Sequence, residues 1–145
     1  MKKEYPILFA LHLFVGAGAL FGGLAGMLNP DEPLGIPNSL LDGSPFSNYF
    51  VPSLILFVVI GLGHIFSAIT AKLHSKHQGY ITSIFSWALM IWIVVQCLII
   101  DTVDFLHVLY FGLGLCGAAL GMRILFAQGS FPANLVIDLF SKEGK

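Results

Sequence analysis

The sequence has few charged residues, and none of them interrupts its longest apolar runs. Lys, Arg, Asp and Glu make up 10% of the 145 residues, whereas hydrophobic residues make up 57%. A soluble globular domain has about 25% charged residues, so this chain lacks the polar side chains needed to cover a surface facing water. The net charge is −1, and the lack of a basic stripe argues against nucleic acid as a partner. The composition therefore places the chain in a lipid bilayer.

Cysteine is also scarce. The only two, Cys97 and Cys116, form no CxxC pair. If they lie on antiparallel helices joined near residue 101, they sit roughly 5 Å and roughly 17 Å from that turn, at about 1.5 Å per residue. A disulfide requires Cα atoms about 4.4–6.8 Å apart. We therefore expect two free thiols and no thiol–disulfide chemistry within the chain.

Four long runs of apolar residues dominate what is present. They cover residues 7–28, 51–71, 80–100 and 105 to about 122. Each approaches the ~20 residues that cross a hydrocarbon core of ~30 Å, and in lipid such a run must be helical to satisfy its own backbone. The pattern predicts an all-α fold, a four-helix bundle forming a single transmembrane domain over residues 1–145.

The basic residues indicate the direction of the spans. All seven fall on one side of the predicted bundle: Lys2, Lys3, Lys72, Lys76, Arg123, Lys142 and Lys145. The opposite side carries acidic residues and no Lys or Arg. Because basic residues accumulate in cytoplasmic loops, both termini are expected to be cytoplasmic.

A secretory signal peptide is the alternative for the first run. Two lysines, an apolar stretch and Ala17-Gly18-Ala19 resemble a signal with a small-residue cleavage site. The apolar run continues to Leu28, however, beyond the roughly 7–15 residues typical of such a signal. We therefore expect a retained membrane span.

Two segments outside the spans have local structure of their own. The loop of residues 29–51 contains four prolines. Within it, Ser44-Pro45 predicts the start of a short interfacial helix reaching Phe50. In the tail, apolar residues at helical spacing over about 131–141 predict an amphipathic helix on the cytoplasmic interface. A partner-binding helix is the alternative for this tail.

Small residues indicate which helices approach most closely, since lipid provides little hydrophobic drive for association. Glycines recur at helical spacing on the first and fourth spans: Gly18, Gly22, Gly26, Gly114, Gly117 and Gly121. We expect these two helices to make the closest contacts, with each other or with a second copy of the chain. A homo-oligomer through the glycine-rich faces follows from the second arrangement.

Polar and aromatic residues of the third and fourth spans form the main candidate site. The ligand-binding candidates are Trp92, Gln96, His107 and Tyr110. The short turn at residues 101–104 makes the two spans antiparallel neighbours, so Gln96 and His107 are expected to meet at the same depth. Such a pocket, capped by Asp101 or Asp104, suits a lipid headgroup, an isoprenoid or a small amphipathic ligand. The alternative is an interhelical hydrogen bond flanked by aromatic anchors.

Two further histidines lie in the spans. His12 and His64 sit roughly 7 Å and roughly 12 Å from the cytoplasmic edge, at about 1.5 Å per residue. Depth alone allows bis-histidine haem ligation. Polar side chains in spans more often bridge helices by hydrogen bonds, so the sequence predicts no metal site and no cofactor, with these two residues as the weak metal candidates.

Two short elements resemble sequences of a known group of proteins. They are Gly43-Ser44-Pro45-Phe46-Ser47-Asn48-Tyr49-Phe50-Val51-Pro52-Ser53-Leu54 and Trp92-Ile93-Val94-Val95-Gln96. The chain resembles, from about residue 14 to 121, small uncharacterised bacterial integral membrane proteins with four spans, which often have glycine where Ser53 stands here. The resemblance implies the four-span fold and the plasma membrane of a bacterium, and it implies no chemistry.

Three functional hypotheses follow. The first is a non-enzymatic membrane module that binds a lipid-like ligand or a partner membrane protein, with no catalytic residues. The second is a haem-binding redox protein that uses the intramembrane histidines. The third is a small oligomeric transporter, which the absence of Asp, Glu, Lys and Arg deep in the spans disfavours, because transporters usually place such a residue there.

Overall fold

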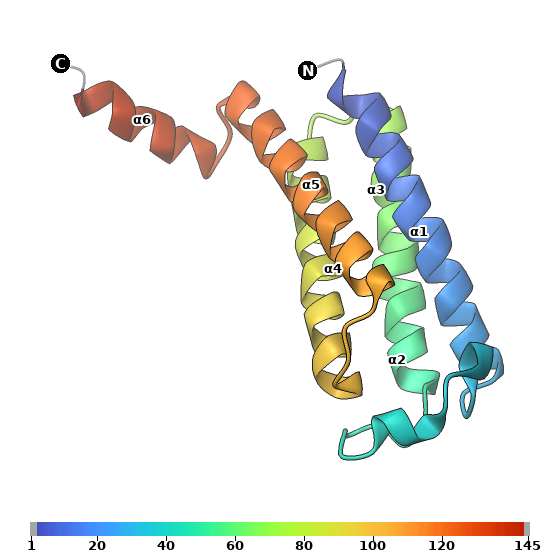
Figure 1. The fold of residues 1–145 in the computed structure, drawn as a ribbon. Coiled ribbons are helices and arrows are strands. Elements are labelled where there is room, and N and C mark those ends of the chain that lie inside the picture. The colour runs from blue at the N-terminus through green and yellow to red at the C-terminus, as the bar shows by residue number, and fades with distance from the viewer. Residues whose placement is uncertain (1–2, 144–145) are drawn as a thin grey trace.

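The computed structural model describes residues 3–143, and these form helices and loops without a strand. Four helices are long and apolar enough to cross a membrane. They are α1 (Glu4–Leu28), a composite second span, α4 (Gln78–Ile100) and α5 (Phe105–Gln128). A further helix, α6 (Ala133–Glu143), follows the bundle. The predicted all-α fold with four long apolar helices is thus confirmed (Figure 1).

The second span is continuous but not uniformly α-helical. It consists of α2 (Phe50–Ile55), a π-helical segment η3 (Leu56–Leu62) and α3 (Gly63–Lys72). Seven residues of π-helix are unusual, since π segments are rare and are frequently found at functional sites. Here the π segment ends two residues before His64.

The fourth span extends further than its apolar run. It continues past Arg123 and ends at Gln128, where Gly129 adopts a left-handed conformation with φ 58°. Glycine tolerates that conformation and commonly terminates helices. Arg123 lies 3.2 Å from a carboxylate oxygen of Glu4 on α1, so the extended turn is tied to the start of the first span.

The two ends of the bundle differ in charge. The end where α1 begins and α5 finishes carries the described basic residues of the bundle, and we call it the basic end (Figure 1). The opposite end holds the loop of residues 29–49 and the α4–α5 turn, and we call it the acidic end. Its acidic residues are Asp31, Glu32, Asp42, Asp101 and Asp104.

Helix packing differs from the expected pairing of the first and fourth spans. α1 packs mainly against the second span, and α5 packs mainly against α4. The glycines of α5 allow its close packing against α4. A Cβ on Gly121 would lie 3.1 Å from the carbonyl oxygen of Gly79 on α4. Contact between α1 and α5 is sparse, with Gly18 against the Tyr110 ring as one point of approach. Within the chain, the predicted pairing of the first and fourth spans was therefore wrong, because each glycine face has a nearer neighbour.

Within α1, Gly18 and Gly26 pack closely as expected, against the side chains of Tyr110 and Ser53, but Gly22 does not. A Cβ on Gly23 would lie 2.8 Å from the Ser53 carbonyl oxygen and 2.9 Å from the Cα of Phe57. By contrast, a Cβ on Gly22 would meet only the end of the Leu56 side chain, at 3.5 Å. Of these two neighbouring glycines, Gly23 therefore touches the backbone of another helix, and Gly22, one of the glycines expected to pack closely, does not.

The loop at the acidic end does not contain the expected helix from Pro45 to Phe50. It forms two 3₁₀ turns instead, η1 (Pro33–Gly35) and η2 (Asn38–Leu41), followed by bends. Ser44 caps no helix, because its hydroxyl accepts the N–H of Phe46 only two residues ahead, at 3.2 Å. The side-chain amide of Asn38 donates a hydrogen bond to the backbone carbonyl of Ser47, and the hydroxyl of Tyr49 donates one to that of Pro37. These two hydrogen bonds connect separate parts of the loop.

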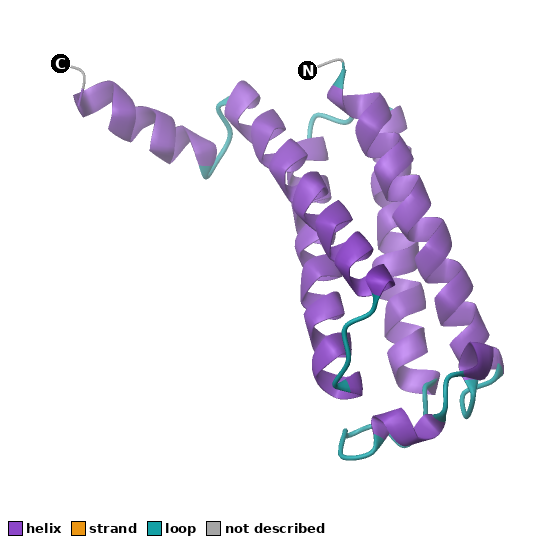
Figure 2. Cartoon of the chain, in the orientation of Figure 1, coloured by secondary structure: helices purple, strands orange, loops and turns teal. Residues whose placement is uncertain are grey.

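The tail forms the predicted helix, α6. It projects away from the bundle (Figures 1 and 2). Its large apolar side chains are exposed, among them Leu135, Leu139 and Phe140. An exposed apolar face on one helix is the pattern of an amphipathic helix.

Candidate functional site

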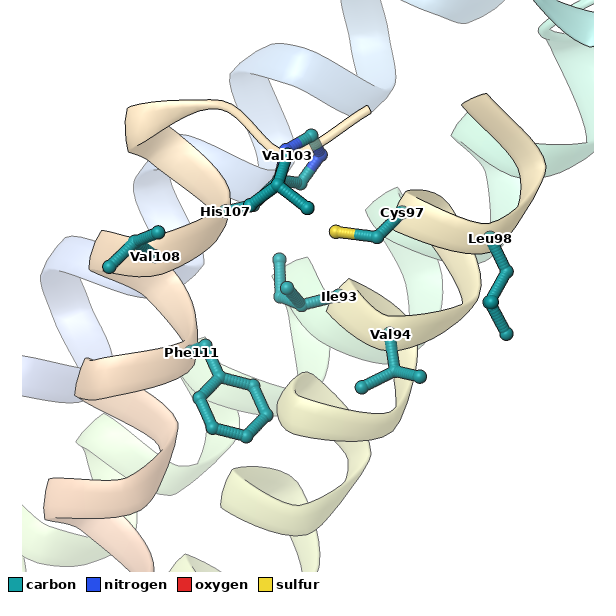
Figure 3. A pocket seen from close by; sticks show the side chains of 8 residues that line it. All are labelled: Ile93, Val94, Cys97, Leu98, Val103, His107, Val108 and Phe111. Atoms are coloured by element: carbon teal, nitrogen blue, oxygen red, sulfur yellow. The ribbon is translucent and has the colours of Figure 1, made fainter. Parts of the chain in front are cut away.

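A groove lies between α4 and α5 near the acidic end, which we call the α4–α5 groove (Figure 3). Its volume is about 300 Å³, at the lower end of ligand sites. It is lined by Ile93, Val94, Cys97, Leu98, Val103, His107, Val108 and Phe111. All of these except His107 are apolar or weakly polar.

The groove is open to the surroundings of the bundle. Ile93 is buried, whereas Leu98 and Val108 are 77% and 62% exposed. The sulfur of Cys97 points into the space between the helices (Figure 3). The lining is almost entirely apolar, so an occupant of the groove must be apolar along most of its length.

His107 provides the polar group of the groove, and the α4–α5 turn fixes its orientation. Asp104 is the N-cap of α5, and the Nδ1 of His107 accepts its backbone N–H at 3.0 Å. His107 thus completes a capping box, the role usually filled by Glu or Gln. A neutral imidazole carries one N–H. Because Nδ1 of His107 accepts a hydrogen bond, the proton of the neutral ring is on Nε2. A hydrogen-bond donor is therefore held at the end of the groove next to the turn.

The other three predicted ligand-binding residues do not line this groove. Trp92 is buried in the core with Val15 of α1 and Ile60 of η3, and Tyr110 packs toward α1 beside Gly18. Gln96 is half-buried. Among the described residues no hydrogen bond joins Gln96 to His107, whose Nδ1 accepts the backbone N–H of Asp104.

A second polar site lies closer to the basic end. Six fully buried polar side chains, which we call the buried polar cluster, come from α1, α3 and α4: His12, His64, Ser67, Gln78, Thr82 and Ser86. The Nε2 amide of Gln78 lies 3.2 Å from the Ser67 carbonyl oxygen and 2.9 Å from the Thr82 hydroxyl. The Thr82 hydroxyl in turn lies 3.2 Å from Nε2 of His12. The cluster therefore links three helices by hydrogen bonds.

The two histidines of the cluster are adjacent. The ring centroids of His12 and His64 are 5.0 Å apart, and the rings are tilted by 49°. His64 Nδ1 lies 2.9 Å from the backbone carbonyl of Ile60. Neither His12 Nδ1 nor His64 Nε2 has a hydrogen-bond partner among the described residues. The fold thus brings together two residues that the sequence offered only as separate candidates.

Sequence reasoning missed the remaining members of this cluster. The signal was present in Gln78 and Thr82, which are four residues apart and so share a helix face. Gln78 lies outside the predicted span, because the apolar run begins at residue 80. The helix begins two residues earlier, which places the Gln78 side chain inside the bundle.

No group of three or more His, Cys, Asp or Glu residues that could hold a metal ion occurs within residues 3–143. Comparison of the chain with protein-family models, with curated proteins and with solved structures found no match. The functional argument therefore depends on the geometry of the two sites.

Proposed function

We propose that the protein is a non-enzymatic membrane module that binds one phospholipid molecule in the α4–α5 groove. The observation that carries the proposal is a groove of about 300 Å³ with an apolar lining and one fixed imidazole at its end. An acyl chain lies along Ile93, Leu98 and Phe111. The N–H of His107 donates to an oxygen of the headgroup region.

The charge near the turn favours a headgroup that includes an ammonium group. Asp101 and Asp104 are exposed beside the groove, and no Lys or Arg lies at this end among the described residues. A zwitterionic aminophospholipid provides a phosphate oxygen for His107 and an ammonium group for the carboxylates. An anionic headgroup without an amine would be repelled by the two aspartates.

Orientation and setting form part of the same proposal. The basic end is cytoplasmic, as the distribution of Lys and Arg favours, so the groove opens toward the outer leaflet. The resemblance to small bacterial membrane proteins favours the plasma membrane of a bacterium. In this arrangement α6 lies on the cytoplasmic surface.

Topology is tested by cysteine labelling in intact cells. In a chain with Cys97→Ser and Cys116→Ser, a cysteine introduced at Ser39 is expected to react with a membrane-impermeant maleimide. A cysteine introduced at Ser75, in the loop at the basic end, is expected to react only after permeabilisation. The reverse pattern would place the groove in the inner leaflet and overturn the proposed orientation.

Lipid binding is tested by filling the groove. Cys97→Phe directs a large ring into the space between α4 and α5 and is expected to weaken binding of phosphatidylethanolamine at least tenfold, about 1.4 kcal/mol. Cys116→Phe is the matched control, since Cys116 is exposed on α5 and does not line the groove. Native mass spectrometry of the protein released from nanodiscs measures the bound lipid.

The headgroup contact has its own variant in the same assay. His107→Glu retains a side chain suited to the capping box but removes the N–H donor, so the preference for phosphatidylethanolamine over phosphatidylglycerol is expected to fall while the helix remains intact. Equal lipid retention by Cys97→Phe and Cys116→Phe would refute binding in this groove.

Two alternatives have less support. A haem between His12 and His64 would require two opposed metal bonds of about 2 Å and a porphyrin between the rings, which a centroid separation of 5.0 Å does not accommodate. A Soret band in the purified protein would favour haem despite this.

The glycine-rich faces contact neighbouring helices of the same chain, which removes the main argument for a homo-oligomer or an oligomeric transporter.

A further inference from the structure

The two adjacent histidines of the buried polar cluster play no part in lipid binding at the α4–α5 groove. Both side chains are fully buried, and they come from separate helices, α1 and α3. Ionisable residues inside a membrane are rare and mark functional sites by default, proton-binding sites among them. What this pair can bind depends on which of its ring nitrogens carry a proton.

The hydrogen bonds at the two ends of the cluster indicate the direction of donation. The Ile60 carbonyl can only accept, so Nδ1 of His64 donates to it at 2.9 Å, and Nε2 of the neutral His64 ring carries a lone pair. At the other end, the Gln78 amide donates to the Thr82 hydroxyl at 2.9 Å. The hydroxyl keeps its own proton and can donate it to Nε2 of His12, 3.2 Å away. His12 then carries its proton on Nδ1.

This arrangement makes the two unpaired nitrogens partners of one another. His12 Nδ1–H is a donor and His64 Nε2 is an acceptor, and neither has a partner among the described residues. A ring nitrogen lies about 1.1 Å from its centroid, so an N–H···N bond of about 2.9 Å holds two centroids about 5 Å apart. The centroids are 5.0 Å apart, so rotation of the rings about their side-chain torsions suffices. The other tautomer of His12 would leave two lone pairs without a donor, which buried polar groups avoid.

We propose that His12 and His64 share this hydrogen bond and together bind one additional proton inside the bundle. The proton adds to the lone pair of His12 Nε2, which then donates to the Thr82 hydroxyl oxygen. That oxygen has two lone pairs, and its own proton turns to the backbone carbonyl of Gln78, four residues earlier on α4, a usual acceptor for threonine in a helix. The inner N–H···N bond and the bond to Ile60 remain, so the charged pair loses no hydrogen bond.

The surroundings limit the site to one proton. The buried polar side chains among the described residues include no Asp, Glu, Lys or Arg. Tyr5 and Lys72 are seven and eight residues along their helices from His12 and His64, which is about 10–12 Å. A second proton would place two like charges side by side with nothing to offset them. The other titratable or charged side chains on α1, α4 and α5 are Glu4, Tyr80, Cys97, His107, Tyr110, Cys116 and Arg123, and η3 has none.

The direct test is solid-state NMR of the full, unmutated chain in phospholipid bilayers, with 15N-labelled histidine. At neutral pH a through-bond coupling is expected between a protonated ring nitrogen and an unprotonated ring nitrogen of two different histidines. On acidification, one further nitrogen of the same two rings is expected to become protonated, with the coupling retained. The double change His74→Gln and His77→Gln, in the exposed loop, is the control and should leave the coupled signals unchanged.

Thr82→Val tests the hydroxyl that must change from donor to acceptor. Valine has a similar shape but offers His12 no hydrogen bond, so proton binding by the pair is expected to weaken at least tenfold, since hydrogen bonds to charged groups are the stronger ones. Ser86→Ala is the matched control, because it also removes a buried hydroxyl from α4, one that has no hydrogen-bond partner among the described residues. Its proton binding should equal that of the unmutated chain.

Three results would overturn the proposal. They are the absence of a coupling between two histidine rings at either pH, the absence of proton uptake by the pair while circular dichroism shows intact helices, and equal weakening by Thr82→Val and Ser86→Ala. The first two use the unmutated chain and do not depend on whether a variant folds. Failure of this test leaves lipid binding at the groove unaffected, because the two sites share no residue.

Discussion

Replacing Gly23 with alanine is expected to destabilise the bundle by about 1–3 kcal/mol, the usual cost of overpacking. The added Cβ would lie 2.7 Å from Cβ of Phe57 and 2.8 Å from the backbone carbonyl oxygen of Ser53. Backbone atoms cannot rotate away, so α1 and the second span must separate. Gly23→Leu should be more damaging still. The measurement is the free energy of unfolding in mixed micelles, followed by circular dichroism.

The neighbouring glycine is a matched control for this change. At Gly22 an added Cβ meets only the Leu56 side chain, at 3.5 Å. Alanine is favoured over glycine in a helix by about 1 kcal/mol, so Gly22→Ala is expected to be neutral or stabilising. Equal losses for Gly22→Ala and Gly23→Ala would contradict the packing of α1 described above.

Gln78→Leu is expected to reduce the free energy of unfolding by about 1–3 kcal/mol, because it leaves buried polar groups without a donor. Gln78 is fully buried, and its amide contacts the Ser67 carbonyl, the Ser67 hydroxyl and the Thr82 hydroxyl. Leucine has a similar size but none of these hydrogen bonds. The same unfolding assay measures the loss.

Gln96→Leu is the control for Gln78→Leu. It makes the same chemical change on the same helix, but Gln96 is half-buried and makes no side-chain hydrogen bond among the described residues. Its replacement is expected to leave stability unchanged or to raise it, since an apolar side chain suits a membrane helix better. A larger loss at Gln96 than at Gln78 would show that the polar contacts of α4 are misassigned.

The two sites differ in how far the sequence could predict them. His107 was identified because a polar residue beside a short turn between two spans has a defined depth. Its partner Gln96 was predicted from depth alone, and depth says nothing about rotation. His107 instead turns back to cap its own helix at Asp104, a local contact that competes with any bond across the groove.

The sequence by itself determined the number of long apolar helices and their approximate bounds. A run of about 20 apolar residues has one stable conformation in lipid, so α1, α4 and α5 could be recognised without tertiary information. The free cysteines and the helix of the tail followed from equally local arguments. These predictions depend only on length, spacing and composition.

Only the tertiary structure decided which helix faces meet. Several faces of one span offer small residues, and the choice between them depends on the shape of every neighbour at once. A shift of one residue, from Gly22 to Gly23, rotates the contact by about 100° around the helix, at about 3.6 residues per turn. The same rotation determines whether His12 faces the lipid or packs against His64. The pair of adjacent buried histidines is thus a product of packing, because no local pattern in the sequence records how two helices are turned toward each other.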